Sequence, residues 1–256
     1  MAKFEVSMMS HTLKRGIDLT VVIPSVTYPD VIACENEGKA VTQKISDKYP
    51  VLYLLHGFSG DHHVWTGYAN TEMYAEERKI AVVMLSGENK AYQDHEPMDL
   101  FYDFIESELQ DFIKTMFPVS DRVEDTYIAG LSMGGYGTLI HALGNPQKYH
   151  AFGAFSAGVQ NRRGPKILQN EVMDLIEYNH ENKIALPKGY ISCGCKDHLY
   201  EDDKKVFEKL NEYGYDVTWS EDPRYAHEWR FWDQEIEAFL DWIPRTDAWK
   251  DVRTSV

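Results

Sequence analysis

The stretch TYIAGLSMG, residues 126–134, decides the fold of this chain. Its first half is a short apolar run that predicts a buried strand, and its second half is a G-x-S-x-G turn centred on Ser132. Apolar residues at helical spacing follow and end near Gly144, so a helix is expected after the turn. The two glycines let the backbone bend sharply where a side chain would crowd the neighbouring strand or helix. A strand, a tight turn and a helix in this order indicate an α/β sheet covered by helices.

Further apolar runs repeat the strand pattern along the chain. Runs at 51–55, 80–85, 151–155 and 189–193 are apolar at consecutive positions, as parallel strands buried on both faces are. Segments with helical spacing of apolar residues lie at 99–116, 203–213 and 228–243. The first segments, 4–10 and 17–24, alternate more, as an antiparallel sheet edge does. We therefore predict an α/β fold with a doubly wound, mostly parallel sheet flanked by helices.

The chain length predicts one domain, residues 1–256. One break in composition falls at residues 158–188, a connection longer than usual between two predicted strands. We expect a short insertion there, and two interpretations stay open: a small cap over the functional site, or a plain surface helix pair. The tail after Pro244 is expected to be a loose end.

Charge and cysteine content narrow the classes of partner and compartment. The net charge of −15 repels nucleic-acid phosphates and anionic lipid headgroups, so we predict no nucleic-acid and no membrane partner. The three cysteines, Cys34, Cys193 and Cys195, are too few and odd in number for a disulfide framework. Residues 1–6 lack an apolar signal core, and no stretch approaches the length of a membrane span. We expect a cytoplasmic protein.

Ser132 is the first candidate for chemistry, because its turn projects the hydroxyl at a helix N-terminus. A plain helix N-cap is the alternative role for this serine. A serine hydroxyl needs a base, and His227, the last of ten histidines, lies between a predicted strand and the final helix. Asp197 directly follows the predicted strand 189–193 and is the expected acid, since the order Ser, Asp, His is that of α/β-hydrolases. Glu201, Asp202 and Asp203 compete for this role, although acids are expected at a helix start.

Candidate substrate contacts surround this serine. The tetrahedral intermediate of acyl transfer needs two backbone N–H donors, and we predict those of Met133 and of Phe58 in the loop 56–60. His56 precedes the serine in this loop and is expected to be structural. Aromatic residues crowd the same loops, so we predict substrate contacts among Trp65, Tyr92, Tyr200 and Trp229. Residues 61–63 and 94–96 combine histidines with acids but show no known ligand spacing, so no metal is predicted.

Four blocks of sequence carry a family resemblance: PVLYLLHGFSG (50–60), IAGLSMGGYG (128–137), CGCKDHLY (193–200) and VTWSEDPRYAHEWRFW (217–232). Together they resemble the tributyrin esterase branch of the esterase D-like α/β-hydrolases, in the family's order and over essentially the whole chain. The resemblance implies a triad of Ser132, Asp197 and His227, oxyanion donors at Phe58 and Met133, and hydrolysis of short-chain acyl esters without a cofactor. Some relatives hydrolyse aryl or feruloyl esters, and relatives often self-associate. The segment 156–188 is shorter than the family's insertion, which leaves the acyl-length preference open.

The predicted function is that of a serine carboxylesterase acting on a small-molecule ester through an acyl-enzyme. Three alternatives stay open. An S-formylglutathione hydrolase-like thioesterase would use the same triad, and an acyltransferase would pass the acyl group to an alcohol. A non-catalytic binding module with a hydrolase fold is disfavoured, because such modules usually lack a triad member and none is missing here.

Overall fold

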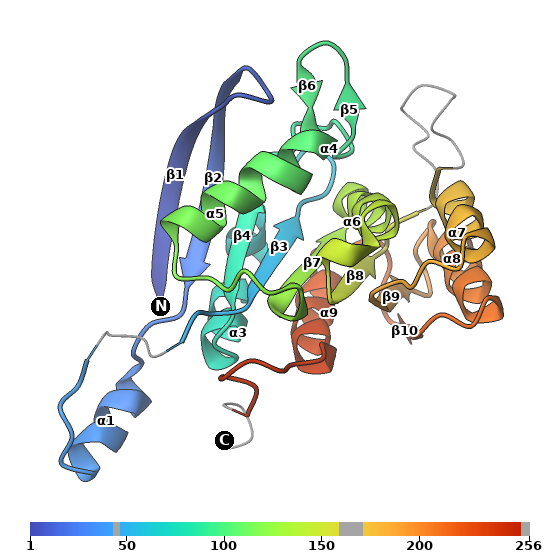
Figure 1. Ribbon diagram of the computed structural model, residues 1–256. Coiled ribbons are helices and arrows are strands. Elements are labelled where there is room, and N and C mark those ends of the chain that lie inside the picture. Colours follow the sequence, from blue (N-terminus) through green and yellow to red (C-terminus); the bar gives the residue numbers. More distant parts are fainter. Residues whose placement is uncertain (43–46, 159–170, 252–256) are drawn as a thin grey trace.

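The computed structural model describes residues 1–42, 47–158 and 171–251 (Figure 1). An eight-stranded sheet in the order β1-β2-β4-β3-β7-β8-β9-β10 forms its centre. The β1–β2 and β2–β4 pairs are antiparallel, and every other pair in this sheet is parallel. The prediction of a doubly wound, mostly parallel sheet with an antiparallel edge is confirmed. The strands are β1 (Ala2–Ser10), β2 (Arg15–Ile23), β3 (Val51–Leu55), β4 (Ala81–Leu85), β7 (Thr126–Leu131), β8 (Ala151–Phe155), β9 (Lys188–Gly194) and β10 (Val217–Asp222), with a separate pair β5 (Asp94–His95) and β6 (Asp99–Leu100).

Helices cover both faces of the sheet, and each face has its own hydrophobic cluster. In one cluster, alternate strand residues such as Tyr53 and Ile128 pack against α4, α5, α6, α7 and α8. In the other, Leu54 and Tyr127 pack against α2, α3 and α9, and Figure 1 shows α5 in front of the strands with α3 and α9 behind them. The helices are α1 (Tyr28–Asn36), α2 (Val64–Tyr68), α3 (Thr71–Glu77), α4 (Phe101–Asp103), α5 (Gln110–Met116), α6 (Met133–Gly144), α7 (Glu171–Glu181), α8 (Tyr200–Glu212) and α9 (Trp229–Trp242). Within the described ranges, no helix is long and apolar enough to cross a membrane.

The helix expected over 99–116 contains a wide turn. A π-helical segment, η1 (Phe104–Leu109), joins α4 to α5, so the three pieces form one interrupted helix. Apolar spacing predicts this helix but does not reveal the wide turn. A turn that contains one extra residue still has apolar residues in the same order along the sequence, so it looks like an ordinary helical turn. Buried Glu106 lies in the wide turn and accepts a hydrogen bond of 2.7 Å from the Tyr149 hydroxyl.

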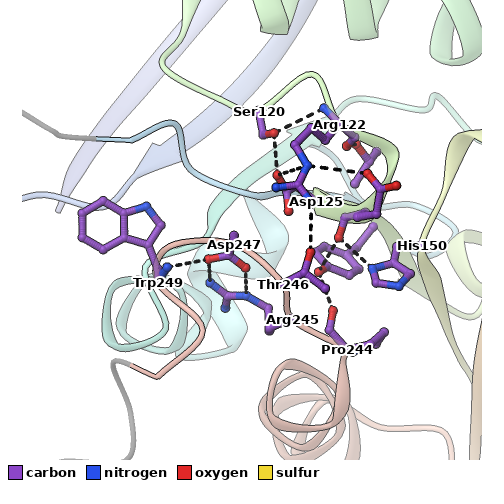
Figure 2. Close-up of polar contacts among 12 residues, drawn as sticks. Ser120, Arg122, Asp125, His150, Pro244, Arg245, Thr246, Asp247 and Trp249 are labelled. Carbon is purple, nitrogen blue, oxygen red and sulfur yellow. Dashed lines mark hydrogen bonds and ion pairs between the residues drawn. The ribbon is translucent and has the colours of Figure 1, made fainter.

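The tail was expected to be a loose end, and this prediction is wrong for its described residues (Figure 2). The Arg245 guanidinium binds both oxygens of Asp247, at 2.5 and 2.7 Å, and the backbone N–H of Trp249 donates to the same carboxylate at 2.9 Å. The Trp249 ring stacks on Tyr49 with its centroid 5.3 Å away. The contacts of Asp247 lie within a local turn, whereas Tyr49 is far away in the sequence. Contacts of this kind leave no periodic pattern in the sequence of the tail.

The expected insertion at 158–188 falls partly on residues 159–170, which lie outside the described residues. The part that follows forms α7, whose Val172 and Ile176 are buried in the cluster shared with α6 and α8. This helix therefore extends one helical layer of the fold.

Candidate active site

The carboxyl ends of β3 and β7 meet at the point where the strand order reverses. The chain passes from β3 to β4 on one side, and then returns to place β7 on the other side of β3. Ligands of open α/β sheets bind outside the strand ends at such a switch point. A cleft of about 810 Å³ opens there, and Ser132, His227 and the loop after β3 contribute to its wall. No residue of the described segment 171–188 lines this cleft.

Ser132 sits in a strained turn between β7 and α6. Its backbone has φ 52° and ψ −116°, a region that residues with a side chain rarely adopt. The flanking glycines make the turn possible: a Cβ on Gly130 would lie 2.5 Å from the oxygen of Gly134, and a Cβ on Gly134 would lie 2.3 Å from the oxygen of Leu55. The serine side chain does not cap the helix, so its hydroxyl is available to the cleft.

His227 links Ser132 to Asp197. Its Nε2 lies 3.0 Å from the Ser132 Oγ, and its Nδ1 lies 2.8 Å from the Asp197 Oδ2. The three side chains follow three different strands, β7, β9 and β10, and only the fold brings them together. The geometry matches that of a serine nucleophile, a histidine base and an acid that orients the histidine.

Backbone contacts hold the Asp197 turn beside the His227 loop. The Lys196 N–H donates to the Tyr225 carbonyl at 3.0 Å. A Cβ on Gly194 would lie 2.5 Å from the same carbonyl oxygen, so glycine at this strand end lets the two loops approach. The distance between the acid and the histidine is thus fixed by the main chain as well as by the side chains.

Asp197 is buried, yet its surroundings favour the charged carboxylate. Burial by itself would raise its pKa, but hydrogen bonds from His227 and from the Leu199 N–H outweigh burial and hold the pKa of Asp197 below its usual value. A carboxylate that stays ionised can accept the imidazole N–H and stabilise an imidazolium.

Asp203, a competitor for the acid role, has a different position. It is fully buried and accepts the backbone N–H groups of Ala157 and Gly158, at 2.9 and 2.6 Å. Burial raises the pKa of Asp203 to about 8 in spite of these donors. Both loop residues line the cleft, so Asp203 supports the cleft wall after β8 from behind.

The loop after β3 presents its backbone to the cleft beside Ser132. Phe58 and Met133 both line the cleft, and Met133 is the first residue of α6, where N–H groups lack partners within the helix. His56 is buried and braces this loop: the Gly87 N–H donates to its Nε2 at 2.7 Å, and its Nδ1 lies 2.6 Å from the Gly57 carbonyl. Since Nε2 accepts, the proton lies on Nδ1, and His56 is a structural residue.

Of the four aromatic residues expected to contact substrate, the structure places only Trp229 in the cleft wall. Trp65 and Tyr92 are fully buried, with the Trp65 Nε1 donating to the Leu55 carbonyl and the Tyr92 hydroxyl donating to the His56 carbonyl. The Tyr200 hydroxyl donates to Glu221 at 2.6 Å, outside the cleft. The structure places these three side chains outside the cleft wall, because aromatic content does not tell which side of a loop faces the core.

Sequence reasoning missed Trp232. Its ring meets the His227 ring edge-on at 4.8 Å, and its Nε1 donates to the Ser156 Oγ at 3.2 Å. The spacing of the tryptophans could have indicated this position, because Trp232 lies three residues after Trp229 and therefore on the same face of α9. Tyr68 was also missed; it stacks on Trp229 at 5.1 Å and extends the aromatic wall of the cleft.

Comparison with known proteins agrees with this fold. The Esterase family model, described as "Putative esterase", matches residues 41–254. The acetyl esterase of Caldicellulosiruptor saccharolyticus is 28% identical over 272 residues, which cover 96% of this chain and 99% of that protein. The fluorophosphonate-binding serine hydrolase FphF of Staphylococcus aureus has a TM-score of 0.83 at 26% identity, over 96% of this chain and 99% of its own. The S-formylglutathione hydrolase FrmB of Staphylococcus aureus has a TM-score of 0.78 at 26% identity, over 94% and 98%.

The sheet with its flanking helices is therefore the α/β-hydrolase fold, which the similar serine hydrolases share. With the family model spanning most of the sequence and relatives that match over nearly their whole length, this chain is a carboxylic ester hydrolase and belongs to the Esterase family.

Proposed function

We propose that this protein is a serine carboxylesterase that hydrolyses short-chain acyl esters, with Ser132 as nucleophile, His227 as general base and Asp197 as the orienting acid. The continuous hydrogen-bond chain from Asp197 through His227 to Ser132, with lengths of 2.8 and 3.0 Å, is the observation that carries the proposal. The positive φ of Ser132 supports it, since strain of this kind concentrates at functional residues.

In the acylation step, the Ser132 Oγ attacks the ester carbonyl carbon while its proton moves to the His227 Nε2. The carbonyl oxygen becomes an oxyanion, which the backbone N–H groups of Met133 and Phe58 stabilise. His227 then gives its proton to the leaving alkoxide, the carbon–oxygen bond breaks, and the alcohol departs. In the second step, water gives a proton to His227, attacks the acyl-serine and releases the carboxylic acid, and Ser132 recovers its proton.

The cleft wall supports small and aromatic ester substrates. Phe58, Tyr68 and Trp229 place aromatic surface at its opening, where an aryl leaving group or acid would stack. Met133 and Leu199 complete an apolar wall near Ser132. We propose acetyl, butyryl and feruloyl esters as the substrate range, in keeping with the tributyrin esterase resemblance.

Hydrolysis of p-nitrophenyl acetate, butyrate and octanoate and of a feruloyl ester, by wild type and by Ser132→Ala, tests the proposal. Short esters are expected to turn over only in the wild type. Ser59→Ala is the matched control, because Ser59 also lines the cleft and is expected to keep its activity. Loss of activity in Ser59→Ala with retention in Ser132→Ala would overturn the nucleophile assignment.

A parallel assay with S-formylglutathione addresses the thioesterase alternative, which the similarity to the Staphylococcus aureus hydrolase motivates. A kcat/KM for the thioester far above that for p-nitrophenyl acetate would replace the carboxylesterase proposal. Acyl transfer to added alcohols in place of hydrolysis would identify an acyltransferase.

We also propose a single cytoplasmic domain, residues 1–256, that needs no cofactor and self-associates. Three free cysteines, one of them buried, support a reducing compartment. Light scattering coupled to size exclusion measures the association state directly.

A further inference from the structure

Glu5, His62 and His63 form a cluster of ligand-type side chains outside the cleft, and no step of the proposed reaction uses them. Their ligand atoms all lie within 4.8 Å of one another. The Glu5 Oε2 is 3.1 Å from the His63 Nε2 and 3.4 Å from the His62 Nδ1. A tetrahedral Zn²⁺ with bonds of about 2.0–2.1 Å holds its ligand atoms roughly 3.4 Å apart. We infer that these three side chains are a binding site for a divalent first-row transition metal ion such as Zn²⁺.

The strand register and a buried hydroxyl orient the cluster. Glu5 on β1 is paired directly with Thr20 on β2. The Thr20 Oγ1 is fully buried, donates to the Glu5 Oε2 at 3.1 Å and lies 2.8 Å from the His62 Nδ1. One fixed hydroxyl thus contacts two of the three ligand atoms. Because its single proton goes to Glu5, the His62 Nδ1 donates to this hydroxyl, and a bound ion would replace that Nδ1 proton.

A carboxylate also faces the far side of one histidine. The Asp61 Oδ1 accepts the backbone N–H of His63 at 2.8 Å and lies 3.7 Å from the His63 Nδ1, the ring nitrogen that points away from Glu5. At 3.7 Å the carboxylate is too far away for a hydrogen bond to this nitrogen, but its negative charge raises the basicity of the imidazole.

The ligand types of the cluster suit a transition metal ion. Metal binding uses the neutral imidazole, whose ring nitrogen presents its lone pair to the ion. The centroids of the two imidazole rings are 3.7 Å apart, so the rings turn away from each other when both nitrogens bind one ion. Two nitrogens and one carboxylate favour Zn²⁺, Co²⁺ or Ni²⁺ over Mg²⁺ and Ca²⁺, which prefer oxygen ligands.

The proposed ion would join distant parts of the chain. Glu5 belongs to the antiparallel edge of the sheet, and His62 and His63 belong to the loop between β3 and α2. The same loop carries Phe58, so the ion would tie the oxyanion loop to β1. Because an ion that binds only the folded state stabilises it by mass action, Zn²⁺ at a hundredfold excess over its Kd is expected to raise Tm by about 5 °C.

The test uses full-length, untagged protein stripped with EDTA. Calorimetric titration with Zn²⁺ is expected to show one ion per chain, and Co²⁺ is expected to give the visible absorption of a tetrahedral nitrogen–oxygen site. Glu5→Gln and His63→Ala are expected to lose at least tenfold in affinity for Zn²⁺ and to lose the rise in Tm. Asp61→Asn is expected to weaken binding roughly 10-fold while keeping the stoichiometry.

The matched control is His198→Ala, because Asp197, His198 and His227 form a second group of three ligand-type side chains among the described residues. This variant is expected to bind Zn²⁺ with the wild-type Kd. Loss of binding in His198→Ala with retention in Glu5→Gln would place the ion at the triad and overturn the inference. Absence of Zn²⁺ binding to the wild type, or wild-type affinity in Glu5→Gln, would overturn it as well. Circular dichroism in EDTA, expected to match the wild type, confirms that each variant is folded.

Discussion

The Asp197→Asn variant tests the proposed acid most directly. Asp197 accepts two N–H groups, from the His227 imidazole at 2.8 Å and from the Leu199 backbone at 3.0 Å. An asparagine has one carbonyl oxygen and one amide nitrogen in place of two carboxylate oxygens. If its oxygen accepts the Leu199 N–H, its NH₂ faces the His227 Nδ1. That nitrogen must then become an acceptor, the imidazole proton moves to Nε2, and the histidine no longer accepts the serine proton.

The size of the effect follows from the loss of the productive tautomer and of a buried negative charge. The same substitution in the serine-protease template lowers kcat about 10⁴-fold, which corresponds to about 5.4 kcal/mol in the activation free energy. The side chain of Asp197 has no exposed surface, so water cannot replace the missing acceptor. We therefore expect a kcat reduction of roughly 10⁴-fold for p-nitrophenyl acetate.

Stopped-flow and steady-state hydrolysis of p-nitrophenyl acetate at pH 7.5 measure this effect, with Tm recorded to confirm folding. Asp202→Asn is the matched control, since Asp202 lines the cleft but belongs to the first turn of α8. It is expected to stay within about tenfold of the wild type. If Asp197→Asn keeps more than a tenth of the wild-type kcat, or if Asp202→Asn shows the larger loss, the assignment of the acid is refuted.

Three further predictions concern the turn, an anchored carboxylate and the cleft wall. Gly134→Ala puts a methyl carbon 2.3 Å from a backbone oxygen of β3, so urea unfolding should show a free energy of unfolding about 3 kcal/mol lower than that of the wild type. Gly67→Ala is the control: Gly67 lies in α2 with open space around it, and this variant should be neutral or stabilising. Burial would raise the pKa of Glu108, but hydrogen bonds from residues 10–12 outweigh burial and lower it to about 2. The ionised carboxylate therefore stabilises the folded protein above its usual pKa, and this stabilisation is lost as the pH falls through 2. After allowance for the exposure of the side chain, Glu108→Gln should lower the free energy of unfolding by roughly 1–2 kcal/mol at pH 7 and by little at pH 2. Trp232→Phe should lower kcat about 10-fold, because it loses the indole hydrogen bond to Ser156 beside the proposed base, His227. Trp229→Phe should raise KM with kcat nearly unchanged, and the reverse pattern in steady-state kinetics would contradict these positions.

Local sequence patterns determined the strands and most of the helices, because burial on both faces gives continuous apolar runs and burial on one face gives helical spacing. The run 51–55 and the run 151–155 are strands with those bounds in the structure. Ser132, Asp197 and His227 each follow a predicted strand, and the carboxyl ends of parallel strands meet at one edge of a sheet. The sequence therefore predicts that these three residues lie close together. Glycine at 130 and 134 marked the turn, because only a residue without a side chain fits between β3 and α6.

The tertiary structure decided which side each loop residue faces. Trp65 and Trp229 belong to similar aromatic segments, yet one is core and the other lines the cleft, because each side chain packs against partners far away in the sequence. The anchored tail depends on pairing with distant residues in the same way. The proposed metal ligands His62 and His63 show no ligand spacing in the sequence, because the third member of the cluster, Glu5, lies on β1 and is set opposite Thr20 by the register of the sheet. Sequence alone determined what chemistry was present, and long-range packing decided which groups meet.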